Sequence, residues 1–145
     1  MRSRRLVTLV LLLLVVVGLA AFSAKPLLTA RGEFWTSKDI AGMSLEMQVA
    51  FNVKDRGDPE DDRGNISVRV FDKGSGKLIA VAVSSDVWDV QPFGAGILFM
   101  VDIRIASGAF PISGVFPIVA FDGAVDQMIV GGVWLNVERG NIVIR

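Results

Sequence analysis

The sequence predicts an all-β domain, an antiparallel β-sandwich of about eight strands, after an N-terminal signal helix. Apolar and polar residues alternate with a period of two in several segments, which places one face of a strand on a core and the other in water. Glycine, proline and aspartate separate these segments at short intervals, as turns do. A small β-barrel is the alternative, because the runs 78–83 and 97–100 are apolar on both faces and would also suit a closed sheet around an apolar lumen.

The N-terminus has the order of a secretory signal. Arg2, Arg4 and Arg5 precede an apolar run over 6–17, and small residues follow as far as Ala24. This order predicts a signal peptide over residues 1–23. The alternative is an uncleaved membrane anchor, because 6–22 reaches the lower end of the roughly 17–25 residues that a spanning helix needs. In both cases we expect the rest of the chain outside the cytoplasm, secreted or periplasmic, and in contact with a membrane only through this segment.

The first half of the domain is predicted to be a series of hairpins. Residues 24–31 are expected to form a tether and 32–145 the domain, with a first short strand near 33–36. The clearest alternation covers 44–54, and the pattern resumes over 66–70 after a polar loop, which predicts an antiparallel hairpin. Glycines over 73–77 then lead into the strand 78–83.

The second half begins at a break that contains Pro92 and Gly94. The segment 97–106 follows and is expected to be the longest central strand. The prolines in the two Phe-Pro-Ile triplets of 110–118 remove ladder donors, so an edge or a bent corner is expected there. Short strands complete the series at 118–121, 127–130, 134–138 and 141–145, and no further helix is expected.

Charge and cysteine content exclude some classes of partner. If the three signal arginines are removed from the 15 basic residues, 12 remain against 15 acidic ones. A mildly acidic surface repels phosphate backbones, so nucleic acid is not an expected partner. The chain has no cysteine, so the domain has no disulfides and depends on burial for its stability.

The absence of three residue types limits catalysis. The chain has no histidine, cysteine or tyrosine, which excludes histidine-based triads, thiol nucleophiles and imidazole or thiolate zinc sites. Carboxylate chemistry or a Ser–Lys pair remains. Asp102, Asp122 and Asp126 lie on or beside late strands, but no spacing pairs them, and we interpret them as solvent-facing or turn residues. The chain is therefore not expected to be an enzyme, and a carboxylate-based enzyme is the third hypothesis.

One loop contains a candidate calcium site. Asp58, Glu60 and Asp62 alternate in the acidic loop 55–65 and could offer three carboxylates to one hard cation. The spacing departs from an EF-hand, because Arg63 stands where that loop has glycine. A charged, solvated hairpin loop is the favoured interpretation, and calcium is the one cofactor considered.

A second candidate site surrounds a tryptophan. Trp88 lies between Asp86 and Asp89, and an indole ring beside two acceptors could bind a sugar. A tryptophan at the core or rim of the sandwich is the favoured interpretation.

Several short phrases together resemble a known family. The phrases are 50–54, the strand that ends at Phe71-Asp72, and the closing segment 139–144. Together with the alternating middle strand they resemble the post-COAP domain, a β-sandwich-like module of exported bacterial proteins. The resemblance covers roughly Gly32 to Arg145. It implies a secreted appended domain without established catalysis and without functional residues that could be assigned.

These observations predict an exported, non-catalytic binding or structural accessory domain, whose ligand is unknown and whose partner lies in the envelope or outside the cell. The alternative is a barrel-type carrier of a small apolar ligand. That alternative predicts a continuous apolar lumen inside the sheet.

Overall fold

The computed structural model describes residues 27–145, and within this range it contains ten antiparallel strands and no helix. The antiparallel all-β class predicted from the alternation is therefore confirmed. The predicted signal peptide over 1–23 lies outside the described residues. The strands are β1 (Leu28–Ile40), β2 (Met43–Asp55), β3 (Arg63–Asp72), β4 (Leu78–Ser84), β5 (Val87–Phe93), β6 (Gly96–Gly108), β7 (Gly114–Phe121), β8 (Gln127–Val130), β9 (Val133–Asn136) and β10 (Arg139–Ile144).

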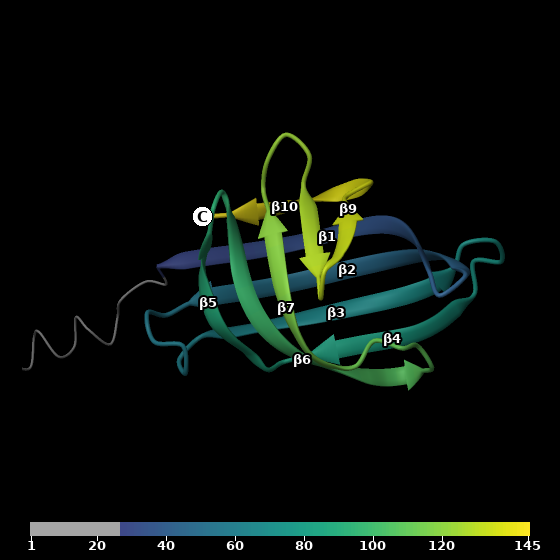
Figure 1. The fold of residues 1–145 in the computed structure, drawn as a ribbon, viewed down its shortest axis with the longest axis horizontal. Coiled ribbons are helices and arrows are strands. Elements are labelled where there is room, and N and C mark those ends of the chain that lie inside the picture. The colour runs from purple at the N-terminus through teal and green to yellow at the C-terminus, as the bar shows by residue number, and fades with distance from the viewer. Residues whose placement is uncertain (1–26) are drawn as a thin grey trace, which may run out of the picture.

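All ten strands belong to one open sheet that folds over itself. Its order is β10-β1-β2-β3-β4-β6-β7-β8-β9, and β5 pairs with β6 beside this path. Strand β6 connects the two halves, because Arg104–Gly108 pair with β4 while Gly96–Ile103 pair with β7. In Figure 1 the strands β5, β6 and β7 pass in front of β1, β2 and β3. We call β1 to β4 with β10 the first half, and β5 to β9 the second half.

The core lies between these halves, and β2 shows how the sequence forms it. The predicted alternation over 44–54 is confirmed, because every second residue of β2 is buried: Leu45, Met47, Val49, Phe51 and Val53. The residues of β6 alternate in the same way, so Ile97, Phe99, Val101 and Ile103 face the first half from the other side. The rings of Phe51 and Phe99 stack with their centroids 6.1 Å apart and join the two halves.

Two elements differ from the expectation. Strand β1 has 13 residues and begins at Leu28, inside the segment expected as a tether. Its pattern was hidden because Gly32 occupies an inward position, where an added Cβ would lie 2.6 Å from Phe51 Cε1. Strand β5 was not expected, because it contains Pro92 and its register shifts between Trp88 and Gln91. The segment expected to be the longest strand is β6, whose 13 residues equal the lengths of β1 and β2.

The prolines mark a corner and a partly free edge, as expected. The first triplet, 110–112, lies in the connection between β6 and β7. Pro117 pairs with Met100 of β6, but the ladder between β7 and β8 begins only at Ile118. Pro117 therefore lies just beyond the end of the β8 ladder. Its carbonyl accepts from the backbone N–H of Gly131 at 3.0 Å, and its missing N–H removes a donor only at this end of the strand pair.

Candidate binding sites

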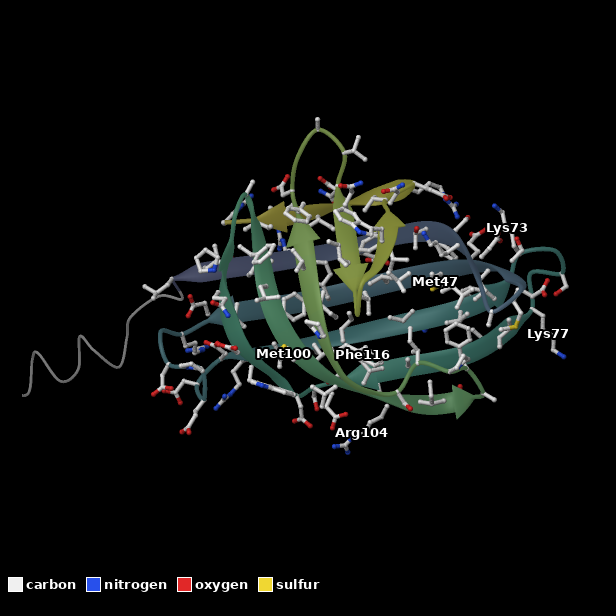
Figure 2. The ribbon with its side chains drawn as sticks, viewed as in Figure 1. Met47, Lys73, Lys77, Met100, Arg104 and Phe116 are labelled. Carbon is white, nitrogen blue, oxygen red and sulfur yellow. The ribbon has the colours of Figure 1, made fainter. Side chains whose placement is uncertain are left out.

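An apolar cavity of about 170 Å³ lies between the two halves of the sheet. Most of its lining side chains are aliphatic or methionine, two are phenylalanine, and none is charged. Two of the lining residues, Met47 of β2 and Phe116 of β7, are labelled in Figure 2 and belong to different halves of the sheet. The full lining is Ile40, Met47, Val49, Ile66, Val68, Ile103, Phe110, Pro111, Ile112, Phe116, Met128, Val130, Gly131, Val133 and Leu135.

The burial of the lining residues separates the floor of the cavity from its mouth. The floor is formed by buried side chains of β2, β3, β6, β8 and β9, among them Met47 and Met128. The mouth is formed by partly exposed residues at three places: Ile40 at the end of β1, Pro111 and Ile112 in the β6–β7 connection, and Val133 beside the β8–β9 turn. The cavity therefore opens near the end of β1, which the strands of the second half do not cover.

Local sequence explains why space remains there. The β6–β7 connection covers the first half with a loop in place of a strand, and it contributes Phe110, which is buried. The β8–β9 turn consists of Gly131 and Gly132, whose φ values of 54° and 86° suit a two-residue hairpin turn. A side chain at position 131 would also collide with Phe116, because an added Cβ would lie 2.8 Å from Cδ1 of that ring.

A second, polar groove of about 530 Å³ lies on the surface at the opposite end of β2. It brings together residues from both sites predicted from the sequence: Glu60 and Asp62 of the calcium hypothesis, and Asp86 and Trp88 of the sugar hypothesis. Asp58 and Asp89 do not line this groove. The remaining lining is Pro59, Arg63, Ser85, Val87 and Asp102.

The carboxylate of Asp62 links the β2–β3 connection to β5 of the second half by hydrogen bonds. Its side chain is buried, with 3% of the residue exposed. The backbone N–H of Arg56 donates to Oδ1 at 2.8 Å, and the backbone N–H of Val90 in β5 donates to Oδ2 at 2.7 Å. Both carboxylate oxygens thus already accept charge-assisted hydrogen bonds inside the protein.

The other two residues of the calcium hypothesis are exposed. The carboxylate of Asp58 accepts a hydrogen bond from the backbone N–H of Glu60 at 3.1 Å, which stabilises a local turn. Within residues 27–145 no three acidic side chains are grouped closely enough to hold a metal ion. The structure therefore places Asp58, Glu60 and Asp62 in one loop without gathering their carboxylates at one point.

The tryptophan of the sugar hypothesis is half-buried beside charged groups. Trp88 pairs with Met100 of β6, and Asp86 lies on the connection before β5. Asp89 sits in the irregular part of β5 with a φ of 54°. Arg104, labelled in Figure 2, lies 3.6 Å from Asp86 and 3.5 Å from Asp102, but its side chain is 72% exposed, so these pairs contribute little to stability.

Asp122 and Asp126 lie in the β7–β8 connection, as expected of turn residues, and both accept hydrogen bonds from a strand, whereas Asp102 lies within β6. The Ile142 N–H of β10 donates to Asp126 Oδ2 at 2.7 Å, and the Ile144 N–H donates to Asp122 Oδ2 at 3.1 Å. Asp102 lies apart from both, in the polar groove. The three carboxylates that a hydrolase could use are therefore not brought together.

The sequence pattern singles out none of the residues that line this cavity, and an apolar lumen is expected from it only for the closed-barrel alternative. The available signal was the proline-containing segment 110–112, because it places a loop where the sheet would otherwise continue. The alternation of 44–54 indicated the inward side of β2 but not which inward residues border a space. That depends on what lies opposite them.

No protein-family model, curated protein or solved structure matches this chain. Across residues 27–145 there is also no helix of the length and hydropathy needed to cross a membrane. The geometry of the two candidate sites is therefore the basis on which a function can be proposed.

Proposed function

We propose that this chain is an exported, non-catalytic binding domain that holds a small apolar group in the cavity between the halves of its sheet. The observation that carries the proposal is the cavity itself, with its volume of about 170 Å³ and its uncharged lining. An engineered apolar cavity of about 150 Å³ in another protein stays dry and binds benzene or xenon. A cavity of this kind favours a hydrocarbon over water, because water would find no hydrogen-bond partners in it.

The size of the cavity limits the ligand to a single ring or a short chain. Each buried methylene contributes about 0.8 kcal/mol, so a six-carbon chain gains about 5 kcal/mol, which corresponds to a dissociation constant of about 0.2 mM. Met47 and Met128 adapt easily to different shapes, because their side chains are unbranched and polarisable. We therefore expect the cavity to bind several small apolar ligands of different shape, not a single rigid compound.

Two features support binding without catalysis. The chain has no histidine, cysteine or tyrosine, and the cavity is lined by no acid or base. The carboxylates of Asp62, Asp122 and Asp126 accept hydrogen bonds from backbone amides, which is a structural use of these groups.

The proposed export rests on the basic and apolar order of residues 1–23. Mass spectrometry of the N-terminus, on protein from culture supernatant, periplasm and membrane, tests it. A new N-terminus near Lys25 outside the cytoplasm is expected. Intact chain in the membrane fraction would favour the anchor, and intact chain in the cytoplasm would contradict export.

The binding proposal can be tested with toluene and the methionine methyl groups. The full chain is purified without detergent, because an alkyl tail could itself enter the cavity. We expect toluene to shift the methyl resonances of Met47 and Met128, which line the cavity, in a saturable way. The methyl groups of Met43 and Met100, which do not line it, serve as internal controls and should not move.

A variant locates the binding to the cavity. Val68→Phe places a ring in the cavity and should weaken toluene binding at least tenfold, whereas Val83→Phe on the exposed side of β4 should leave it unchanged. Val68→Leu is a milder substitute if the phenylalanine variant does not fold. The proposal is wrong if Met47 and Met128 do not respond up to the solubility limit of toluene.

A further inference from the structure

Two polar side chains lie on the inner face of β1 next to residues that line the cavity, although neither lines it itself, and neither has a side-chain partner within residues 27–145. Side chains of a strand alternate between its faces, and β1 pairs with β2 in an unbroken register from Leu28 to Ile40. Thr36 and Lys38 therefore share the face of Ile40, which forms part of the mouth. A polar group on this face lies close to an apolar space.

The first of these groups is the hydroxyl of Thr36. The residue is 1% exposed, and Oγ1 is the one fully buried side-chain nitrogen or oxygen in the described part of the chain that has no hydrogen-bond partner. Thr36 stands directly opposite Met47, which lines the cavity floor. An unpaired buried hydroxyl destabilises the folded protein, so a ligand that accepts a hydrogen bond from it is favoured.

The second group is the ammonium of Lys38. The residue is half-buried, stands opposite the fully buried Leu45, and lies two positions before Ile40 of the mouth on the same face of β1. No carboxylate within residues 27–145 lies within ion-pair distance of it.

The acidic groups nearby are already engaged elsewhere. Asp39 projects from the opposite face of β1, where the hydroxyl of Ser44 donates to it at 2.7 Å. Asp72 lies at the end of β3, and its Oδ1 accepts hydrogen bonds from the backbone N–H and the hydroxyl of Ser75, which lower the pKa of that carboxyl below its usual value. Lys38 is thus left as a cation available to a ligand.

Resting on the proposed function, we infer that the ligand is a short-chain carboxylic acid whose alkyl tail fills the cavity and whose carboxylate is bound by Lys38 and Thr36. An ammonium and a hydroxyl are both donors, and a carboxylate accepts from both at once. The neutral cavity takes the tail, and the cation at its mouth distinguishes a fatty acid from a hydrocarbon or an amine.

The test compares three eight-carbon probes that share one tail: octanoate, octanol and octylammonium. Binding to the full chain is measured by titration of the Met47 and Met128 methyl resonances at low and high salt. We expect octanoate to bind about tenfold more tightly than octanol, since its carboxylate forms charge-assisted hydrogen bonds, and octylammonium to bind least. High salt should reduce the preference for octanoate.

Lys38→Met keeps the apolar stem and removes the charge. It should bring the affinities for octanoate and octanol together, whereas Lys54→Met, on the outward face of β2 at the end away from the cavity mouth, should leave the tenfold preference intact. Thr36→Val should weaken octanoate binding and at the same time raise the stability of the empty protein, because it removes the unpaired hydroxyl.

The two proposals fail in distinguishable ways. Equal binding of octanol and octanoate by the unmodified chain, or a preference that survives Lys38→Met, overturns the inference about the carboxylate and leaves the apolar site standing. If none of the three probes nor toluene moves the methionine methyl groups, both proposals are wrong.

Discussion

At the scale of single residues, the turn between β1 and β2 contains an unfavourable side chain. Ala41 and Gly42 are its two central residues, with φ values of 52° and 76°. A two-residue hairpin turn of this type requires positive φ at both positions, because its twist then matches that of the strands. Glycine adopts this conformation freely, but for alanine it costs about 1–2 kcal/mol.

Ala41→Asn should therefore stabilise the protein by about 0.5–1 kcal/mol, since asparagine tolerates positive φ better than alanine does. The free energy of unfolding in urea measures this effect. Ala124→Asn is the matched control, because Ala124 is also exposed in a connection between strands but does not have a positive φ, and it should give no gain. A loss of stability in Ala41→Asn would contradict the turn assignment.

At the scale of elements, the outer edge of β10 is closed by side chains in place of a neighbouring strand. Thr29 and Arg145 exchange both backbone hydrogen bonds, so the N–H groups of Ile142 and Ile144, in the alternate positions, point away from β1. The carboxylates of Asp126 and Asp122 accept from them. An edge whose donors are occupied in this way is protected from pairing with another chain.

The two caps should be separable by hydrogen exchange of the backbone amides. Asp126→Ala should speed exchange at Ile142 and leave Ile144 close to its original rate, while Asp122→Ala should do the reverse. Each variant is thus the control for the other. Each should lose about 1–3 kcal/mol of stability if the freed amide stays buried, and less where water reaches it. Equal acceleration of both amides in either variant would show that β10 loosens as a whole.

A third carboxylate closes part of the gap between β1 and the chain after β9. The backbone N–H and the hydroxyl of Ser37 donate to the two carboxylate oxygens of Glu138 at 3.0 and 3.1 Å, and the Glu138 N–H donates to the Trp35 carbonyl at 2.9 Å. The guanidinium of Arg139 lies 4.9 Å from the centre of the Trp35 ring. Beyond these contacts β1 continues towards Ile40 without a strand on this side, and there the cavity opens.

At the scale of the whole molecule, the two halves of the sheet are held by the apolar core, by β6 and by one buried carboxylate. Asp62 links the β2–β3 connection of the first half to Val90 in β5 of the second half. This hydrogen bond lies at the end of the molecule away from the cavity mouth. It therefore links the two halves at that end, whereas the cavity opens at the other.

Asp62→Asn should lower the free energy of unfolding by about 1–3 kcal/mol, because an amide has one acceptor oxygen for the two backbone N–H groups and presents its own N–H₂ to the second. Asp61→Asn, next to it and exposed, is the matched control and should change stability by less than about 0.5 kcal/mol. Equal changes in the free energy of unfolding of the two variants would show that the hydrogen bonds of Asp62 to Arg56 and Val90 do not contribute to stability.

The sequence predicted most strands correctly where one face is buried and the other is wet, as in β2 and β3. It did not predict β5, because Pro92 and the irregular register at Trp88 interrupt the alternation, and it shortened β1 because Gly32 stands at an inward position. In both places a contact from elsewhere in the chain decides the structure: Met100 beside Trp88, and the ring of Phe51 against Gly32.

For the candidate sites the outcome was mixed. The residues of the calcium and sugar hypotheses were named from local patterns, and the structure places four of them around one groove, while Asp62 turned out to be occupied by backbone amides. The apolar cavity was not predicted, because a lumen was expected only for a closed barrel. Its lining comes from strands of both halves and from the connections between them, and no local pattern contains that information.

The amino-acid sequence alone determined that the chain after its N-terminal segment is an antiparallel β protein without disulfides, because alternation and turn residues act over only a few positions along the chain. Which inward side chains meet and where a space remains was decided only by the tertiary structure. The tertiary structure also decided that the inward groups Thr36 and Lys38 of β1 have no side-chain partner. All of these features depend on which residues of the second half lie opposite the first half.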